Sequence, residues 1–211
     1  QIESDPDDAL FDLGIDGRER YTLLAAELLD RTGIDIELWQ PGIAHVATEE
    51  RAAVDLRTRV ALQRQHAHHC DWLDADEVRT RWPWLATTHG ALWAPRDGAL
   101  DPQRLVAALL RDAELRGALV VQDEAVALER DGDRVTGVRG RERHAAGTVV
   151  LAAGAWSAML DGLPRPLSVQ PVRGQMAALP WPTPLEPAIV YNRDCYFLKR
   201  GAEALLGSTM E

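Results

Sequence analysis

Cysteines, basic runs and long apolar runs are scarce in this sequence, and each scarcity excludes a class of protein. The two cysteines, Cys70 and Cys195, lie far apart among 211 residues and supply no disulfide framework of the kind that small secreted proteins use. No stretch reads as a signal peptide or stays apolar for long enough to cross a bilayer. Acidic residues outnumber basic residues by 33 to 23, so the formal net charge is −10 and no nucleic-acid-binding face is expected. These absences favour a cytoplasmic protein.

Apolar side chains make up 46% of the chain, which is enough for a substantial core, and they follow alternating helix and strand patterns. Helical spacing predicts a helix over residues 7–32 that ends at Gly33. A hairpin is predicted from strands at 34–38 and 43–48, followed by a polar helix over 49–65. Asp74 and Glu77 have the spacing of a capping box, and Asp101 with Pro102 marks the start of another helix. Further strands are expected at 118–121, 123–128, 134–138, 148–151, 167–179, 188–191, 195–198 and 204–207.

One of these strands carries a second signal. Residues 148–151 are a continuous apolar, β-branched run, typical of a strand buried on both faces in a parallel sheet. Gly154 follows closely, and a glycine permits a turn that another backbone or a ligand can approach. Ligands bind at the carboxyl ends of such strands in open α/β sheets. The pattern alone fits an ordinary strand and turn equally well.

Two clusters of functional residue types have simpler explanations. Residues 66–70, with three histidines and Cys70, bring together potential zinc or copper ligands. Their spacing argues against a metal site, because adjacent histidines point to different faces and no second C-x-x-C or H-x-x-x-H pair exists. Four tryptophans within residues 72–93 are expected to pack in a core or interface rather than to stack on nucleic-acid bases. We therefore predict no metal.

Five motifs of one enzyme family occur along the chain in the family's order. They are Gln1-Ile2-Glu3 (the end of G-M-L-A-P-Q-x-E), residues 149–157 (V-V-x-A-x-G-x-W-S), residues 171–175 (P-V-(K/R)-G-(Q/E)), residues 191–196 (a tyrosine-bearing stretch) and residues 207–211 (G-(S/A)-T-M-E). Through them the chain resembles the FAD-dependent amine and amino-acid oxidases, in particular the glycine oxidase branch associated with thiamine biosynthesis. The resemblance covers essentially the whole sequence.

The resemblance implies an α/β fold, with part of a Rossmann-like FAD-binding domain and a mostly antiparallel α+β substrate domain. It assigns residues 1–33 to a helix on the FAD-domain side, 34–96 and 166–211 to the substrate domain, and 97–165 to the middle of the FAD-binding domain. In this family the substrate's Cα hydrogen leaves as a hydride to the flavin, the imine product hydrolyses, and dioxygen reoxidises the flavin to give hydrogen peroxide. The implied partner is a small amino acid or amine, and assembly into a homo-oligomer stays open.

Site residues follow from the resemblance by position. Tyr196 corresponds to the family's active-site tyrosine and Met210 to a residue that lines the substrate pocket. The implied FAD-binding positions are Ala125, Val126, Ala152, Ala153, Gly154 and Trp156. Without the resemblance, Tyr196 fits ordinary sheet packing and Trp156 fits a gap between helix and sheet. No arginine of this chain takes the place of the family's carboxylate-binding arginine.

The glycine-rich signature G-x-G-x-x-G of dinucleotide-binding proteins is missing. Because the chain also begins and ends inside family motifs, we expect it to be part of a longer flavoprotein. A remnant that no longer binds flavin is the other explanation. Two further alternatives are a dehydrogenase that passes electrons to a quinone, and a non-catalytic interaction subunit that keeps the fold.

Overall fold

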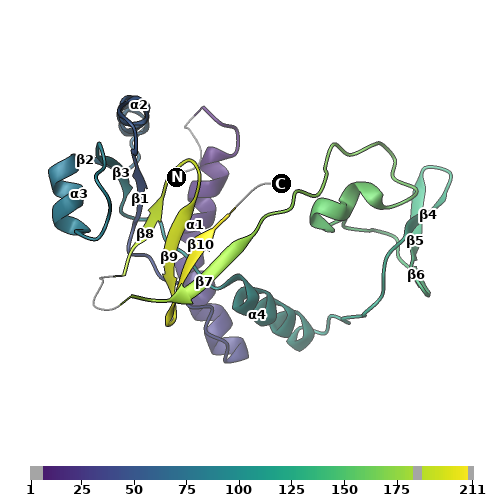
Figure 1. Cartoon of the computed structure of the whole chain (residues 1–211). Coiled ribbons are helices and arrows are strands. Elements are labelled where there is room, and N and C mark those ends of the chain that lie inside the picture. Colours follow the sequence, from purple (N-terminus) through teal and green to yellow (C-terminus); the bar gives the residue numbers. More distant parts are fainter. Residues whose placement is uncertain (1–6, 183–186, 209–211) are drawn as a thin grey trace. The chain divides into compact units, whose positions relative to one another are not determined.

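The computed structural model describes residues 7–182 and 187–208, which fall into two compact units (Figure 1). The chain leaves the larger unit after Ala118, forms the smaller unit over Leu119–Gly174, and returns to the larger unit at Gln175. In the described ranges, no helix is both long and apolar enough to cross a membrane. The domain boundaries implied by the family resemblance stay a prediction.

The larger unit is built on a seven-stranded sheet with the order β2-β3-β1-β8-β9-β10-β7. Its strands are β1 (Ile43–Val46), β2 (Asp71–Leu73), β3 (Ala91–Ala94), β7 (Met176–Pro180), β8 (Ile189–Tyr191), β9 (Tyr196–Arg200) and β10 (Glu203–Gly207). Only the pairing of β1 with β8 is parallel. The structure thus confirms a mixed α/β fold with a mostly antiparallel sheet.

Helices α2 (Glu50–Gln65) and α3 (Ala75–Arg81) pack near the edge of the sheet that is formed by β2 and β3. Successive residues of β3 point to opposite faces, so Leu92 joins a core with Leu56 and Val60 of α2, while Trp93 joins Val78 of α3. The predicted capping box at the start of α3 is confirmed. The Asp74 carboxylate accepts hydrogen bonds from the first helical turn, and the Glu77 carboxylate accepts one from the backbone N–H of Asp74 at 2.7 Å.

Helices α1 (Phe11–Thr32) and α4 (Pro102–Leu115) share a separate core formed by Leu28, Ile36 and Ala108. Gly33 ends α1 in the left-handed conformation, with φ +73°, and its N–H donates to the carbonyl of Leu29. The predicted strand over 34–38 is wrong. Glu37 has φ +54°, which breaks the extended alternation, and Ile36 is buried against the two helices instead.

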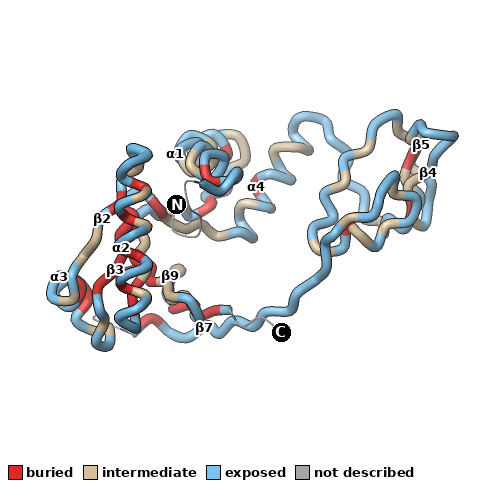
Figure 2. Tube along the Cα trace, turned by 90° about the horizontal axis from the view of Figure 1, so that it is seen from above, coloured by how far each residue is buried: buried red, intermediate tan, exposed pale blue. Residues whose placement is uncertain are grey.

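The smaller unit contains a three-stranded antiparallel sheet of β4 (Ala127–Asp131), β5 (Arg134–Arg139) and β6 (Arg143–Ala145), followed by the 3-10 helix η1 (Gly154–Met159). The strand predicted over 134–138 is confirmed as β5, but the strand predicted over 123–128 is wrong for residues 123–126, where the Asp123 carboxylate accepts from the backbone N–H groups of Arg141 and Glu142 and β4 begins only at Ala127. The strands expected at 118–121 and 148–151, and the part of 167–179 before β7, are not formed. A strand needs a hydrogen-bonded neighbour, and within the described ranges none lies beside these segments. Leu119 and Val150 are accordingly 87% and 85% exposed, and Figure 2 shows the smaller unit as largely exposed.

Candidate functional site

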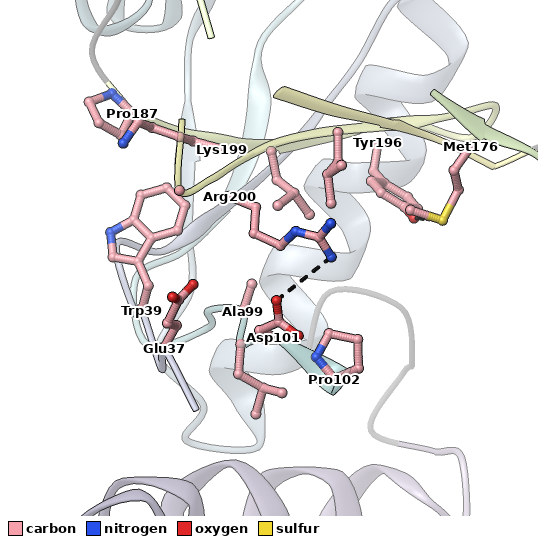
Figure 3. Close-up of a pocket in the computed structure, with 14 residues that line it drawn as sticks. Glu37, Trp39, Ala99, Asp101, Pro102, Met176, Pro187, Tyr196, Lys199 and Arg200 are labelled. Atoms are coloured by element: carbon pink, nitrogen blue, oxygen red, sulfur yellow. Dashed lines mark hydrogen bonds and ion pairs between the residues drawn. The ribbon is translucent and has the colours of Figure 1, made fainter. Parts of the chain in front are cut away.

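A cavity of about 450 Å³ lies in the larger unit, and Tyr196 forms part of its wall (Figure 3). Strands β7, β9 and β10 supply one side through Met176, Tyr196 and Leu205. The other side comes from the segments around Trp39 and Asp101, which precede β1 and α4. The sheet therefore presents an aromatic side chain to a partly open cavity.

Strand alternation explains why Tyr196 faces this cavity. Tyr196, Leu198 and Arg200 occupy alternate positions of β9, so their side chains share one face of the sheet. Phe197 points to the opposite face, where its ring stacks on Trp181 with centroids 5.2 Å apart. The packing of Phe197 fixes the register of β9 because a shift by one residue would exchange the two faces.

Gly207 allows Tyr196 to reach across the neighbouring strand. Gly207 of β10 is the register partner of Tyr196 on one side and of Met176 on the other. The hydroxyl of Tyr196 donates to the sulfur of Met176 at 3.2 Å, above the glycine. A Cβ atom at position 207 would lie 2.9 Å from the tyrosine oxygen and 2.8 Å from Cγ of Met176, which is too close for either side chain to stay in place. The glycine thus holds space for the tyrosine–methionine contact.

The opposite wall is held by backbone hydrogen bonds and by an ion pair. The backbone groups of Trp39 and Ala99 bond to each other in both directions at 2.8 Å. Oδ1 of Asp101 caps α4 by accepting from the N–H groups of Gln103 and Arg104. Its other oxygen, Oδ2, lies 3.9 Å from Nη1 of Arg200, as the dashed line in Figure 3 shows. Asp101 therefore ties strand β9 to the start of α4.

The cavity combines apolar and aromatic walls with a few polar groups, which is the usual composition of a small-molecule site. Tyr196 offers a hydrogen-bonding hydroxyl next to an aromatic wall. Met176 and Leu205 are apolar, while Glu37 and Arg200 bring opposite charges. This arrangement can orient a small polar molecule.

The predicted cofactor-binding positions fall in the smaller unit. Gly154 has φ +55°, and a Cβ atom added there would meet nothing within 4 Å. Its neighbours Ala152 and Ala153 are exposed, and Trp156 is 64% exposed. Small residues with an open backbone on one side fit the approach of a planar cofactor. The assignment of these residues to a cofactor site stays a prediction.

Val126 and its neighbour Ala125 are also exposed, but the backbone of Val126 is already engaged. Its N–H donates to the carbonyl of Arg139 at 2.9 Å, and its carbonyl accepts from the N–H of Asp161 at 3.0 Å. A backbone contact from Val126 to a cofactor would therefore have to share the second lone pair of the carbonyl oxygen. Ala125 precedes β4 and stays a predicted cofactor-binding position.

Asp123 organises the loop beside these residues. Its carboxylate accepts hydrogen bonds from the backbone N–H groups of Arg141 and Glu142 and from Nε2 of His144, the last at 2.8 Å. These donors, with the Arg141 N–H foremost, hold the pKa of Asp123 well below its usual range. The carboxylate thus anchors the β5–β6 loop to the segment that leads into β4.

Of the two residues that the sequence predicted for the substrate site, the structure describes only one. It puts Tyr196 in the cavity wall, and Met210 lies outside the described residues. Met176 and Asp101 were missed as parts of the cavity wall, and Gly207 was missed as the residue between Met176 and Tyr196. Sequence signals for them existed, since Met176 directly follows the P-V-R-G-Q motif and Gly207 opens the G-S-T-M-E motif. Among the described residues, no group of three ligating side chains lies close enough together to hold a metal ion.

A mostly antiparallel sheet that carries a tyrosine into a small cavity agrees with the class of protein that the motifs indicated, the flavin-dependent oxidoreductases. The comparison with protein families supports the same class. Residues 1–211 match the family described as "FAD dependent oxidoreductase", and the chain belongs to this family, whose members and glycine oxidase relatives depend on FAD.

Individual relatives give the same result. The chain is 34% identical over 216 residues to glycine oxidase of Geobacillus kaustophilus, covering 99% of this chain and 57% of that relative. It is 31% identical to hydrogen cyanide synthase subunit HcnC of Pseudomonas aeruginosa, covering 96% of this chain and 50% of the relative. The crystal structure of the Geobacillus kaustophilus glycine oxidase superposes with a TM-score of 0.94 at 32% identity, over 100% of this chain and 58% of that one. The chain thus spans little more than half the length of the relatives that it matches.

Proposed function

We propose that the protein is an FAD-dependent oxidase that removes the amine of glycine or of another small amino acid or amine, with dioxygen as the electron acceptor. The observation that carries the proposal is Tyr196, which reaches the 450 Å³ cavity from the position of the family's active-site tyrosine. The 34% identity to a glycine oxidase supports the choice of substrate class. A cytoplasmic location and a small-molecule partner belong to the same proposal.

The residues of the smaller unit fit a flavin. Bound FAD supplies an acceptor for the hydride that leaves the substrate. Ala152, Ala153 and Gly154 would let the cofactor approach the backbone because their side chains are minimal and the space next to Gly154 is open. The exposed indole of Trp156 would cover part of it. The family assigns these roles, and the conformation at Gly154 is compatible with them.

In the larger unit, Tyr196 would orient the substrate. Its hydroxyl can bond to a carboxylate or amine of the substrate, and its ring excludes water from one side. The sulfur of Met176, 3.2 Å from the hydroxyl, restricts the directions in which the O–H can point. Such a reaction depends on the orientation of the substrate more than on a general base, so a cavity to which no catalytic base is assigned is compatible with it.

The visible absorption spectrum of the flavin-loaded protein, recorded before and after anaerobic addition of glycine, tests the proposal. Flavin bands that bleach with glycine are the expected result. Tyr196→Phe should lower kcat/KM for glycine by about tenfold, which corresponds to the loss of one hydrogen bond. Tyr21→Phe, on helix α1 in the other core, is the matched control and should leave kcat/KM unchanged. Bands that stay unchanged with glycine and with other small amines would contradict the proposal.

A second candidate differs in the electron acceptor. The identity of 31% to a protein named as a subunit of hydrogen cyanide synthase favours a flavoprotein that works within a complex, and a quinone is the alternative acceptor that the family resemblance leaves open. Oxygen consumption separates the two candidates. If glycine bleaches the flavin but air does not restore its colour within the turnover time, the acceptor is not dioxygen. A protein that fails to take up added FAD would support the non-catalytic interaction subunit instead.

A further inference from the structure

A second cavity, of about 520 Å³, lies in the larger unit between helix α2 and strands β1 and β8. His45 of β1 and Tyr191 of β8 are register partners there, and their rings meet edge to face with centroids 4.7 Å apart. Tyr191 is also the register partner of Tyr196 on β9, so both tyrosines project from one face of the sheet. One tyrosine of the pair lines each cavity, and the second cavity has no role in the proposed oxidation.

The charged groups of this cavity are two guanidinium groups and one carboxylate. Arg59 comes from α2, and Arg193 comes from the turn between β8 and β9. Asp55 lies one helical turn before Arg59 and offsets part of the positive charge. Arg59 already has an interaction partner, so Arg193 is the cation of this lining that we take to face a ligand, on a chain whose net charge is −10. This local reversal of sign favours an anionic ligand.

The turn that presents Arg193 is held in place. Oδ1 of Asn192 accepts hydrogen bonds from the backbone N–H groups of Asp194 and Cys195 at 2.9 and 2.7 Å. The N–H of Asn192 donates to the carbonyl of Cys195 at 2.9 Å. Arg193 itself is exposed, so its head group can turn toward an anion while its backbone stays fixed. A fixed backbone lowers the entropy that a bound anion would cost.

The remaining wall is mostly apolar and would suit an aliphatic group. Val46, Ala52, Leu56 and Leu62 contribute to it from β1 and α2. Thr48, Thr58 and His45 add polar groups to this wall, and the Nδ1 atom of His45 is buried and has no hydrogen-bond partner in the part of the chain that the structure describes. A free inorganic anion would leave this apolar surface uncovered, whereas a molecule with an aliphatic body and an anionic head would use both parts of the lining.

We propose that this cavity binds a small aliphatic carboxylic acid, with the carboxylate at Arg193 and the hydrocarbon part against Leu56 and Leu62. Guanidinium groups bind carboxylates through charge-assisted hydrogen bonds of matching geometry. The site is separate from the cavity at Tyr196, because the two cavities share no lining residue. Its occupancy is therefore testable whether or not the protein oxidises glycine.

Isothermal titration calorimetry of the purified protein with hexanoate tests the site, and hexylamine is the probe of equal length and opposite charge. We expect hexanoate to bind, hexylamine to show no binding, and inorganic phosphate to bind at least about tenfold more weakly than hexanoate. Arg193→Gln should weaken hexanoate binding by about tenfold or more, and Arg193→Lys should restore part of the affinity by restoring the charge.

Two control variants locate the ligand. Arg51→Gln removes an exposed cation from the same helix, outside this cavity, and should leave hexanoate affinity unchanged. Lys199→Gln removes a cation from the Tyr196 cavity and should also leave it unchanged. Equal binding of hexylamine, equal binding of phosphate, loss of affinity in Lys199→Gln, or unchanged affinity in Arg193→Gln would each overturn the proposal. Because Arg193 is exposed on a turn, its variants should keep the far-ultraviolet circular dichroism of the wild type, which checks that they fold.

Discussion

Acidification should destabilise the protein through His45. Burial of the imidazole, assisted by the positive charge of Arg59, lowers the pKa of His45 from its ordinary value of 6.5 to about 4. Between these two values the unfolded chain binds a proton at this residue that the folded chain does not bind. The free energy of unfolding therefore contains a contribution that is fully present above about pH 6.5 and is lost as the pH falls toward 4.

The size of this contribution follows from the shift. A difference of one pKa unit corresponds to about 1.4 kcal/mol, so the full shift of His45 sets an upper limit of about 3 kcal/mol. The ring is only partly buried and lines an open cavity, so solvent screens part of this effect. We expect a loss of about 1–2 kcal/mol between about pH 7.5 and about pH 4.5.

Urea unfolding of the wild type and of His45→Gln across this pH range isolates the effect, because carboxylates titrate in both proteins and cancel in the difference. We expect the stability advantage of the wild type over His45→Gln to shrink by about 1–2 kcal/mol as the pH falls. His66→Gln replaces an exposed histidine at the end of α2 and should follow the wild-type curve. Parallel pH profiles for the wild type and His45→Gln would refute the reasoning from burial.

Three further substitutions test other features of the structure. Gly207→Ala places a Cβ atom 2.9 Å from the Tyr196 oxygen, so kcat/KM for the amine substrate should fall. Adding Tyr196→Phe to this variant should lower kcat/KM no further, because both substitutions act on the same hydroxyl. Gly147→Ala is the control, since an added Cβ atom there meets nothing within 4 Å. Asp101→Ala removes the cap of α4 and its ion pair with Arg200, and urea unfolding should show a loss of about 0.5–2 kcal/mol, most of which Asp101→Asn should restore. Gly17→Ala lies inside α1, where an added Cβ atom meets nothing within 4 Å, and should raise the free energy of unfolding by about 0.5–1 kcal/mol. A decrease in stability for Gly17→Ala would show that this helix position is packed.

Local signals predicted the helices well because they act between residues close in the sequence. Asp74 and Glu77 form the predicted capping box, Gly33 ends α1 where the spacing indicated, and Asp101 caps α4. Each of these features depends on hydrogen bonds within one helical turn. The sequence pattern therefore contains nearly all the information that is needed.

The order of the strands is not available from such signals. β1 and β8 are neighbours in the sheet, yet His45 and Tyr191, which are register partners, lie far apart in the sequence. The segment 148–151 shows the reverse case. Its composition favours a strand, but a strand forms only with a hydrogen-bonded partner, and the described residues provide none beside it. The composition of a segment shows that it can form a strand, and a neighbouring strand is needed for the strand to form.

The cavity at Tyr196 combines both kinds of information. The family resemblance placed Tyr196 by position, but it gave no reason for the glycine that opens the G-S-T-M-E motif. The register of three adjacent strands supplies that reason, because it sets Gly207 directly between Met176 and Tyr196. Since the tyrosine hydroxyl meets the methionine sulfur above this residue, any side chain at position 207 would occupy the space that the contact needs. The glycine of this motif thus has a steric explanation, because a residue without a side chain is needed beside the contact between Tyr196 and Met176.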